Sequence, residues 1–245
     1  MLRLGSRRVA GRAKRISVAV IGATLIASLG TASAATLGGL SAKTLFGQSG
    51  AVGVLAGTTV TCDNFTAGAS SAIDGRAVQL PAACGARTWT RGRGTWTITT
   101  GQAGSTSSAN ASVYVPVGST DVSVEATLFN LAGQVGGVAL SHTGTGRIYV
   151  AGVVSATNTV QIRLVNRNTV TALASAPFTI GATVRLRLTR QGSTLTLRVN
   201  GTVAVTATLT AAQITSLTGG TSAGLYAAAS ATIRFDDFLV TTPFP

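Results

Sequence analysis

Few side chains of this sequence can transfer protons or bind metal ions. Among its 245 residues, the carboxylates, imidazole and thiols are Asp63, Asp74, Asp121, Glu125, Asp236, Asp237, His142, Cys62 and Cys84. Acid–base catalysis needs positioned pairs of such groups, and a structural zinc ion needs four converging ligands. Two thiols and one distant histidine do not supply a zinc site. The composition therefore argues against most hydrolytic and metal-dependent reactions.

The N-terminal residues have the pattern of a secretory signal peptide. Residues 1–15 carry six basic side chains and no acid, Ile16–Leu29 is apolar, and small residues follow at Thr31–Ala35. This order predicts a signal peptide over residues 1–34. The general secretory route is favoured, because the arginine pair in the basic region is not followed by the bulky apolar residue of a twin-arginine signal.

We expect the mature protein to be secreted or extracellular, with the cell wall as one location. No later apolar run reaches the roughly 20 residues of a membrane-spanning helix, so we expect no membrane insertion after cleavage. Cleavage removes six positive charges and lowers the formal net charge from +13 to +7. The remaining charge is diffuse and aromatic residues make up only 5% of the chain, so nucleic acid is not an expected partner.

Export would place the two cysteines in an oxidising compartment, where such pairs form disulfides. We therefore predict a disulfide between Cys62 and Cys84. It closes a loop of about 20 residues, which stabilises the fold by about 3 kcal/mol in the chain-entropy description.

Alternating apolar and polar residues predict an all-β fold. Residues 35–61 are rich in Gly and Ala and are interpreted as a spacer or edge segment, whereas from Asp63 onward short alternating runs indicate strands that bury one face. Thr183–Leu209 predicts three antiparallel strands, because Asn200-Gly201 suits a type I′ turn. The only helical turn is expected near Thr210.

The order of several short motifs resembles the concanavalin A-like lectin/glucanase superfamily, also called laminin-G-like. The opening motifs are Asp63-Asn64-Phe65, Asp74-Gly75-Arg76, Thr88-Trp89-Thr90, Gly94–Ile98 and Gln102-Ala103, and the closing ones are Thr183–Leu186, Leu195–Gly201, Gly224-Leu225-Tyr226 and Phe235–Val240. The resemblance implies a two-sheet antiparallel jelly-roll sandwich over residues 62–242, with six or seven strands in each sheet. It also implies a role with carbohydrates, although a fold alone does not establish a function.

The acids do not fit the glycosidases of this superfamily, which use two carboxylates on one strand. Glu125 has no acid two or four residues away. Asp236 and Asp237 are adjacent, so they face opposite sides of a strand. We expect them to shape a bulge in the last strand, and weak calcium binding is the alternative, which would need about six oxygen ligands.

Lyases of related jelly rolls use histidine, tyrosine and arginine, and the resemblance offers His142, Tyr149 and either Arg163 or Arg147 for these roles. Gln161-Ile162-Arg163, however, has arginine where the lyase pattern has histidine. A lone histidine before a Gly-rich turn is more often a solvated loop residue. We therefore expect no catalytic residues.

Binding is the more natural use of the remaining polar and aromatic side chains. The candidate ligand-binding residues are Trp89, His142, Tyr149, Arg163, Arg185 and Arg187. Trp89 either stacks on a sugar or lies in the core. Arg185 and Arg187 share a strand face, where they either bind an acidic glycan or simply occupy solvent-facing positions.

The expected function is that of a secreted carbohydrate-binding, lectin-like or cell-surface recognition domain without catalytic activity and without a cofactor. The expected partner is a polysaccharide or cell-wall glycan, with an acidic glycan as one version. The alternatives are a structural or adhesive extracellular protein, and an atypical polysaccharide lyase or glycosidase. The sequence leaves the ligand and the oligomeric state open.

Overall fold

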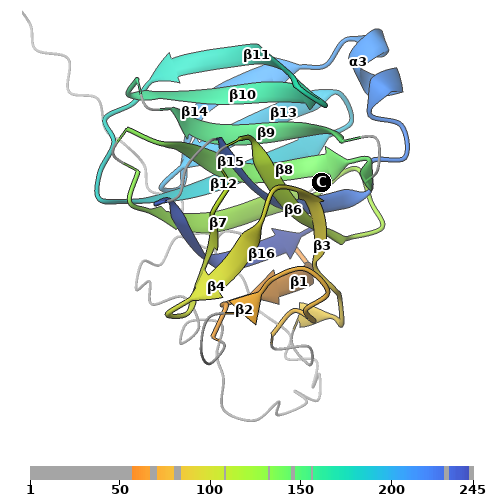
Figure 1. Cartoon of the computed structure of the whole chain (residues 1–245). Helices are drawn as coiled ribbons and strands as arrows, with labels where there is room; N and C mark the ends of the chain where they lie inside the picture. Colours follow the sequence, from red (N-terminus) through yellow and green to blue (C-terminus); the bar gives the residue numbers. More distant parts are fainter. Residues whose placement is uncertain are drawn as a thin grey trace, which may run out of the picture. The chain divides into compact units, whose positions relative to one another are not determined.

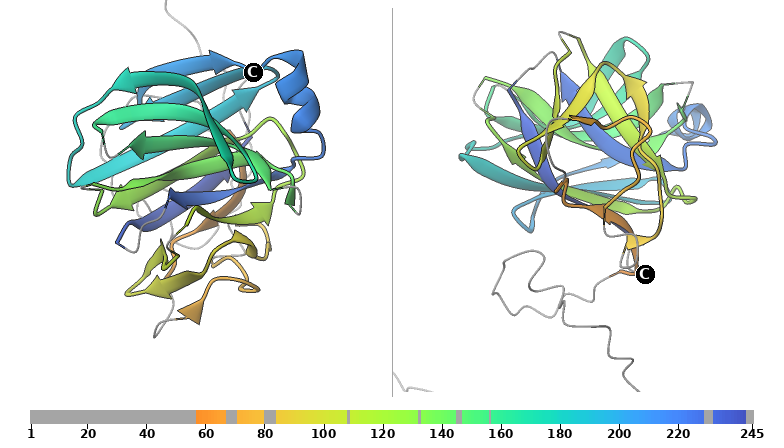
Figure 2. Two further views of the ribbon diagram at one scale, coloured as in Figure 1. Left: turned by 45° about the horizontal axis from the view of Figure 1, so that its top comes forward. Right: turned by 60° about the horizontal axis from the view of Figure 1, so that its bottom comes forward.

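Strand-forming runs of the chain assemble into two antiparallel sheets in the computed structural model, and Figures 1 and 2 show them as two layers. The structure describes residues 57–66, 71–79, 84–107, 109–131, 133–144, 147–155, 157–228 and 232–242. All of them belong to the unit Ser49–Pro245. The predicted signal peptide and residues 35–56 of the predicted spacer lie outside the described residues.

One sheet has nine strands. Their order is β14 (Thr202–Thr208), β13 (Thr194–Val199), β12 (Thr183–Gln191), β7 (Ser123–Phe129), β16 (Arg234–Thr241), β5 (Gln102–Ser105), β4 (Trp96–Thr99) and β2 (Ser71–Ala72), and β1 (Thr59–Asp63) also pairs with β16. The sheet is larger than the six or seven strands that the resemblance implied, because short N-terminal strands extend it.

The other sheet has seven strands, and its order can be followed in Figure 1 from β11 downward. The strands are β11 (Thr169–Pro177), β10 (Thr159–Asn166), β9 (Ile148–Ser155), β8 (Val135–His142), β15 (Ser222–Ala228), β6 (Ala111–Pro116) and β3 (Thr90–Arg93). The predicted all-β sandwich is therefore confirmed. No helix in the described part of the chain combines the length and the apolar character that a membrane crossing requires.

The core lies between the sheets and follows the predicted alternation. Val184, Leu186 and Leu188 of β12 are fully buried, as are Leu195 and Leu197 of β13. Each such side chain stabilises the fold by roughly 1.5–3 kcal/mol relative to exposure. The period of two along these strands therefore decides which face of the sheet is inside.

The predicted turns and irregularities are confirmed. Asn200 and Gly201 both have positive φ, 50° and 86°, as a type I′ turn requires. The helix α3 (Ala211–Ser216) begins with a capping box on Thr210. The pairing of β16 with β7 shifts register between Asp236 and Leu239, which is the expected bulge.

The buried carboxylate of Asp63 ties β1 to the core. Arg76 donates to both of its oxygens, Nη1 to Oδ2 at 2.6 Å and Nη2 to Oδ1 at 3.2 Å, and Trp89 Nε1 donates to Oδ2 at 2.7 Å. The Trp89 ring packs against Phe65 and Phe238, at centroid distances of 5.8 and 4.8 Å. Trp89 is therefore a fully buried core residue, and the prediction that it stacks on a sugar is corrected.

Replacing Asp63 with Asn would leave the Arg76 guanidinium, whose side chain is only 13% exposed, without its counter-charge. We expect Asp63→Asn to lower the free energy of unfolding by about 3–5 kcal/mol. Asp74→Asn is the matched control, because Asp74 is exposed and lies 3.9 Å from Arg91; its effect should stay within about 0.5 kcal/mol. Urea unfolding measures both, and equally small losses would contradict the assignment.

The predicted disulfide between Cys62 and Cys84 is confirmed, and it joins the end of β1 to the segment that leads into Trp89. We expect the double variant Cys62→Ser/Cys84→Ser to lose about 3 kcal/mol of unfolding free energy. Thermal unfolding with and without a reductant measures the loss. A melting temperature that neither the reductant nor the double variant lowers would contradict it.

Candidate functional site

The outer face of the seven-stranded sheet, which points away from the core, carries an unusual group of aromatic side chains. Its floor consists of small residues, with Ala139 on β8 and Ala151 on β9. Tyr149 and Tyr226 pack over this floor and form a hydrophobic cluster separate from the core. Small floor residues allow large side chains from distant strands to lie across the sheet.

Three rings form a stack on this face. The centroids of Tyr114 and His142 are 4.2 Å apart, and those of His142 and Tyr149 are 4.8 Å apart with an interplanar angle of 9°. Tyr226 joins at 6.0 Å from Tyr149 in a tilted arrangement. We call Tyr114, His142, Tyr149 and Tyr226 the ring cluster. Tyr114 is the member with a partly exposed side chain, whereas the other three are buried.

Two local features place His142 in this stack. Ser141 has a positive φ of 54° at a register shift between β8 and β15, and such a bulge re-aims the following side chain. The edge strand β3 passes close above the imidazole at Gly92, where a Cβ atom would lie 2.5 Å from Ser112 Oγ and 2.9 Å from His142 Nε2. Only glycine allows this approach without displacing the histidine.

The contacts of His142 define its tautomer. The backbone N–H of Gly144 donates to Nδ1 at 3.0 Å, so the ring proton lies on Nε2, which faces Ser112 Oγ at 3.4 Å. Burial lowers the pKa of His142 from 6.5 to about 4, because the charged imidazolium is poorly solvated there. His142 is therefore a neutral, 1% exposed residue, and the interpretation of it as a solvated loop residue is wrong.

The tyrosines of the ring cluster are also held in their neutral form. Burial, and then the neighbouring Tyr226, raise the pKa of Tyr149 above its ordinary value. Burial likewise raises the pKa of Tyr226, against the opposing effects of Arg163 and Arg93. The hydroxyl of Tyr226 donates to Asn110 Oδ1 at 3.2 Å.

Two arginines lie beside the ring cluster. Arg163 Nε donates to Gln161 Oε1 at 2.7 Å. Arg93, on the edge strand β3, donates from Nη1 to Asn168 Oδ1 at 2.6 Å. Asn168 lies in the turn between β10 and β11, near the opposite edge of the sheet. The sheet therefore curves around its outer face, which is concave.

The predicted ligand-binding residues thus divide into separate groups. One group lies on the concave face and consists of His142, Tyr149 and Arg163. They come from β8, β9 and β10, which are neighbours in the sheet. Arg185 and Arg187 lie on the outer face of the nine-stranded sheet. Both contact the carboxylate of Glu125, with 2.6 Å from Arg187 Nε to Oε2. Glu125, which is 6% exposed, supplies one negative charge shared by these two arginines, so neither is without a carboxylate contact on that face.

The weak calcium candidates Asp236 and Asp237 lie in the bulge of β16. Asp237 donates its backbone N–H to Asp236 Oδ1 at 2.8 Å and accepts from Thr127 Oγ1 at 3.1 Å. Within the described ranges, no three His, Cys, Asp or Glu side chains converge as a metal site. These contacts fit the predicted role of both aspartates in shaping the bulge.

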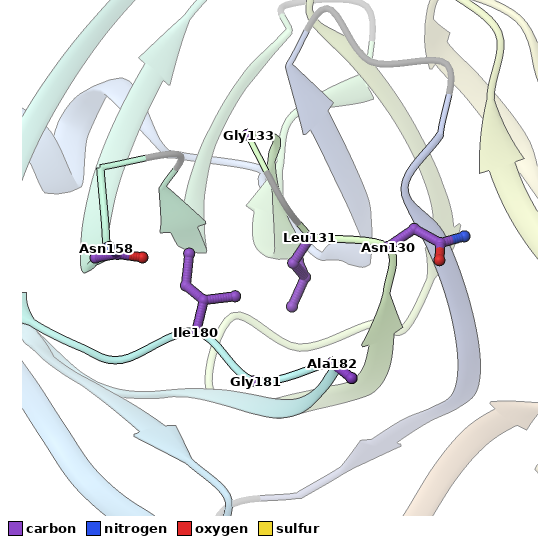
Figure 3. Close-up of a pocket in the computed structure, with 7 residues that line it drawn as sticks. All are labelled: Asn130, Leu131, Gly133, Asn158, Ile180, Gly181 and Ala182. Atoms are coloured by element: carbon purple, nitrogen blue, oxygen red, sulfur yellow. The ribbon is translucent and has the colours of Figure 1, made fainter.

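A shallow pocket of about 500 Å³ lies at the other end of strands β9 and β10 from the Arg93 contact. Its lining residues are Asn130, Leu131, Gly133, Asn158, Ile180, Gly181 and Ala182. In Figure 3, Leu131 and Ile180 point toward the same space and Asn130 points away from it. The lining offers neither an aromatic ring nor a charge, so the concave face is the stronger candidate site.

Sequence reasoning missed Tyr114, Tyr226 and Arg93 as members of the site. Tyr114 and Tyr226 each occupy the outward phase of an alternating strand, and their strands β6 and β15 pair directly, with Gly224 opposite Tyr114. Outward tyrosines in otherwise apolar strands are a signal that the sequence contains. Their meeting with His142 required the strand order of the sheet.

Comparisons with known proteins bear on the fold. No family model and no curated protein matches the sequence. A Bacillus subtilis protein of unknown function with a galectin-like fold matches with a TM-score of 0.50 at 9% identity, over 76% of this chain and 97% of its own. The described part of the chain thus has a galectin-like fold of two antiparallel sheets.

Two further solved structures resemble this jelly roll. LamAcat from Zobellia galactanivorans has a TM-score of 0.49 at 11% identity, over 75% of this chain and 97% of its own. Carbohydrate binding module CBM66 from Bacillus subtilis has a TM-score of 0.47 at 14% identity, over 62% of this chain and 90% of its own. At these identities the likeness concerns the fold alone, and the chemistry of the jelly roll must be argued from its own residues.

The burial of His142 makes stability depend on pH. Between pH 6.5 and about 4 the unfolded chain binds a proton that the folded protein does not. The free energy of unfolding therefore falls by about 3 kcal/mol as pH decreases through this range. Asp236 acts in the opposite direction, because burial raises its pKa from 3.8 to about 6 and its protonation favours the folded state.

Urea unfolding of the wild type and His142→Gln between pH 7.5 and 4 separates the two effects. The free energy of the wild type minus that of the variant should fall by about 3 kcal/mol toward pH 4. Asp236→Asn serves as the control. The unfolding free energy of the wild type minus that of Asp236→Asn should rise as the pH falls toward 4. A difference between wild type and His142→Gln that is independent of pH would contradict the burial of a neutral imidazole.

Proposed function

We propose that the protein is a secreted, non-catalytic jelly roll that binds a polysaccharide on the concave face of its seven-stranded sheet. The observation that carries this proposal is the ring cluster, which combines aromatic rings with planar polar side chains on one curved surface. Binding sites for small polar ligands have this composition, with apolar or aromatic surface and a few directed hydrogen-bonding groups.

The accessible part of the concave face suits a sugar chain. Tyr114 is partly exposed, and an aromatic ring offers an apolar surface to the C–H groups of a pyranose. Gln161, Arg163 and Asn110 have intermediate exposure nearby, and their amides and guanidinium supply donors and acceptors for hydroxyl groups. The buried rings beneath hold this surface in place.

The protonation states support binding without turnover. A general base works best when its pKa lies near the operating pH. The pKa of His142 is about 4, and burial raises the pKa of Tyr149 above its ordinary value, so neither residue is poised for proton transfer at neutral pH. Glu125 lies on the other sheet, where Arg185 and Arg187 hold its carboxylate.

Secretion is supported by two features of the chain. The N-terminal residues have the basic, apolar and small-residue order of a signal peptide. The disulfide between Cys62 and Cys84 is a bond that persists in oxidising compartments. The galectin-like fold of the Bacillus subtilis neighbour supplies an architecture for the proposed polysaccharide binding.

A glycan array followed by titration calorimetry tests the proposal. We expect saturable binding of the mature protein to at least one polysaccharide, and a loss of about two- to tenfold in affinity for Tyr114→Ala, because a ring contact contributes roughly 0.5–1.5 kcal/mol. Thr196→Ala, on the outer face of the nine-stranded sheet, is the matched control and should bind normally.

Assays for reducing ends and for unsaturated products, run on the same polysaccharides, test the absence of turnover. We expect no product from the wild type. Turnover that disappears in His142→Ala would overturn the non-catalytic proposal, and the absence of binding to every glycan would overturn the proposal as a whole.

A further inference from the structure

The arginines of the concave face have no carboxylate partner among the described residues. All six Asp and Glu side chains of the chain lie among the described residues. Four of these acids form ion pairs, namely Asp63 with Arg76, Asp74 with Arg91, Asp121 with Arg190, and Glu125 with Arg185 and Arg187. The other two, Asp236 and Asp237, lie in the bulge of β16.

On the side of the molecule that carries the ring cluster, Arg93, Arg147, Arg163 and Arg167 have no ion pair with an Asp or Glu side chain of the described ranges. Arg147 and Arg167 are exposed, whereas Arg93 and Arg163 are partly buried. Arg93 and Arg163 do make hydrogen bonds, but to neutral amide oxygens, Asn168 Oδ1 and Gln161 Oε1. A neutral acceptor orients a guanidinium without cancelling its charge.

One backbone and one side-chain contact bring Arg147, Arg167 and Arg93 together beside the turn between β10 and β11. The backbone N–H of Arg167 donates to the carbonyl of Arg147 at 3.0 Å. Nη1 of Arg93 lies 3.5 Å from the carbonyl oxygen of Arg167. Arg163 belongs to β10, the strand that ends just before Arg167, and it interacts with the hydroxyl of Tyr226 in the ring cluster.

We infer that the four arginines bind the carboxylates of an acidic polysaccharide, so that the ligand of the concave face is a uronate-containing glycan. The inference rests on the proposed function and adds the chemical class of the ligand. A planar guanidinium matches a carboxylate with two parallel hydrogen bonds. Arginines on a curved, partly desolvated surface also attract an anion more strongly than fully hydrated ones. Tyr114, the partly exposed member of the ring cluster, would contact the sugar ring that carries the acid.

The outer face of the nine-stranded sheet provides an internal comparison. It also carries arginines, but Glu125 lies between Arg185 and Arg187 and cancels much of their charge. Arg198, on the same sheet, donates to the carbonyl of Gly201 at 3.3 Å and makes a matched control for the loss of one positive charge. Its distance from the ring cluster separates a specific site from a general effect of net charge.

The test uses polygalacturonate, its fully methyl-esterified form and a neutral β-glucan, with affinities of the mature protein measured by calorimetry. We expect polygalacturonate to bind at least about tenfold tighter than the ester, with the difference shrinking as salt rises. Arg93→Gln and Arg163→Gln should each weaken polygalacturonate binding about tenfold or more, and each should weaken binding of the ester by a smaller factor. Arg198→Gln should bind like the wild type.

The outcomes separate the inference from the proposed function. Equal binding of polygalacturonate and its ester, or an equal loss in Arg198→Gln, would overturn the acidic specificity while leaving carbohydrate binding in place. The absence of binding to all three glycans would overturn both. If Arg93→Gln fails to fold by circular dichroism, the exposed pair Arg147→Gln/Arg167→Gln gives the same test, and an unchanged affinity and salt dependence in that variant would overturn the inference.

Discussion

The scarcity of carboxylates is the constraint on which the rest of this structure depends. A buried arginine needs a counter-charge or hydrogen-bond acceptors, because a charge removed from water without them costs several kcal/mol. Asp63 fulfils this role inside the fold for Arg76, and Glu125 fulfils it on the nine-stranded sheet for two arginines at once. The acids are used up at these positions, and the concave face is left with positive charge that the protein itself does not neutralise.

The shape of the concave face has a simple origin in side-chain size. Ala139 and Ala151 form a floor that large rings can cover, and the bulge at Ser141 turns His142 onto the same surface. Arg93 then reaches from the edge strand β3 to Asn168 across the curved sheet. The site is thus assembled from strands that are distant in sequence, and its rigidity comes from aromatic packing and not from loops.

This arrangement gives the jelly roll a chemistry of its own. A histidine with tyrosines and arginines on a sheet face superficially suits proton abstraction, but burial lowers the pKa of His142 to about 4, which makes it a weak base, and favours the protonated form of Tyr149. The same burial makes the rings a firm support for the partly exposed Tyr114 and for the arginines. The partly exposed groups on this face are Tyr114, Arg93 and Arg163, whereas His142, Tyr149 and Tyr226 are buried.

Much of the fold was predictable because strands obey local rules. Period-two alternation predicted the buried faces of β12 and β13, Asn200-Gly201 predicted the hairpin turn, and two cysteines in an exported chain predicted one disulfide. The sequence by itself also limited the chemistry, since six acids and one histidine restrict what any fold can build. Which arginines are neutralised was decided only by the tertiary structure. Cross-strand register brings Glu125 to Arg187, which is 62 positions away in the sequence. Sheet curvature brings Arg93 to Asn168. Neither contact is encoded by a local sequence pattern, because both depend on the order and register of distant strands.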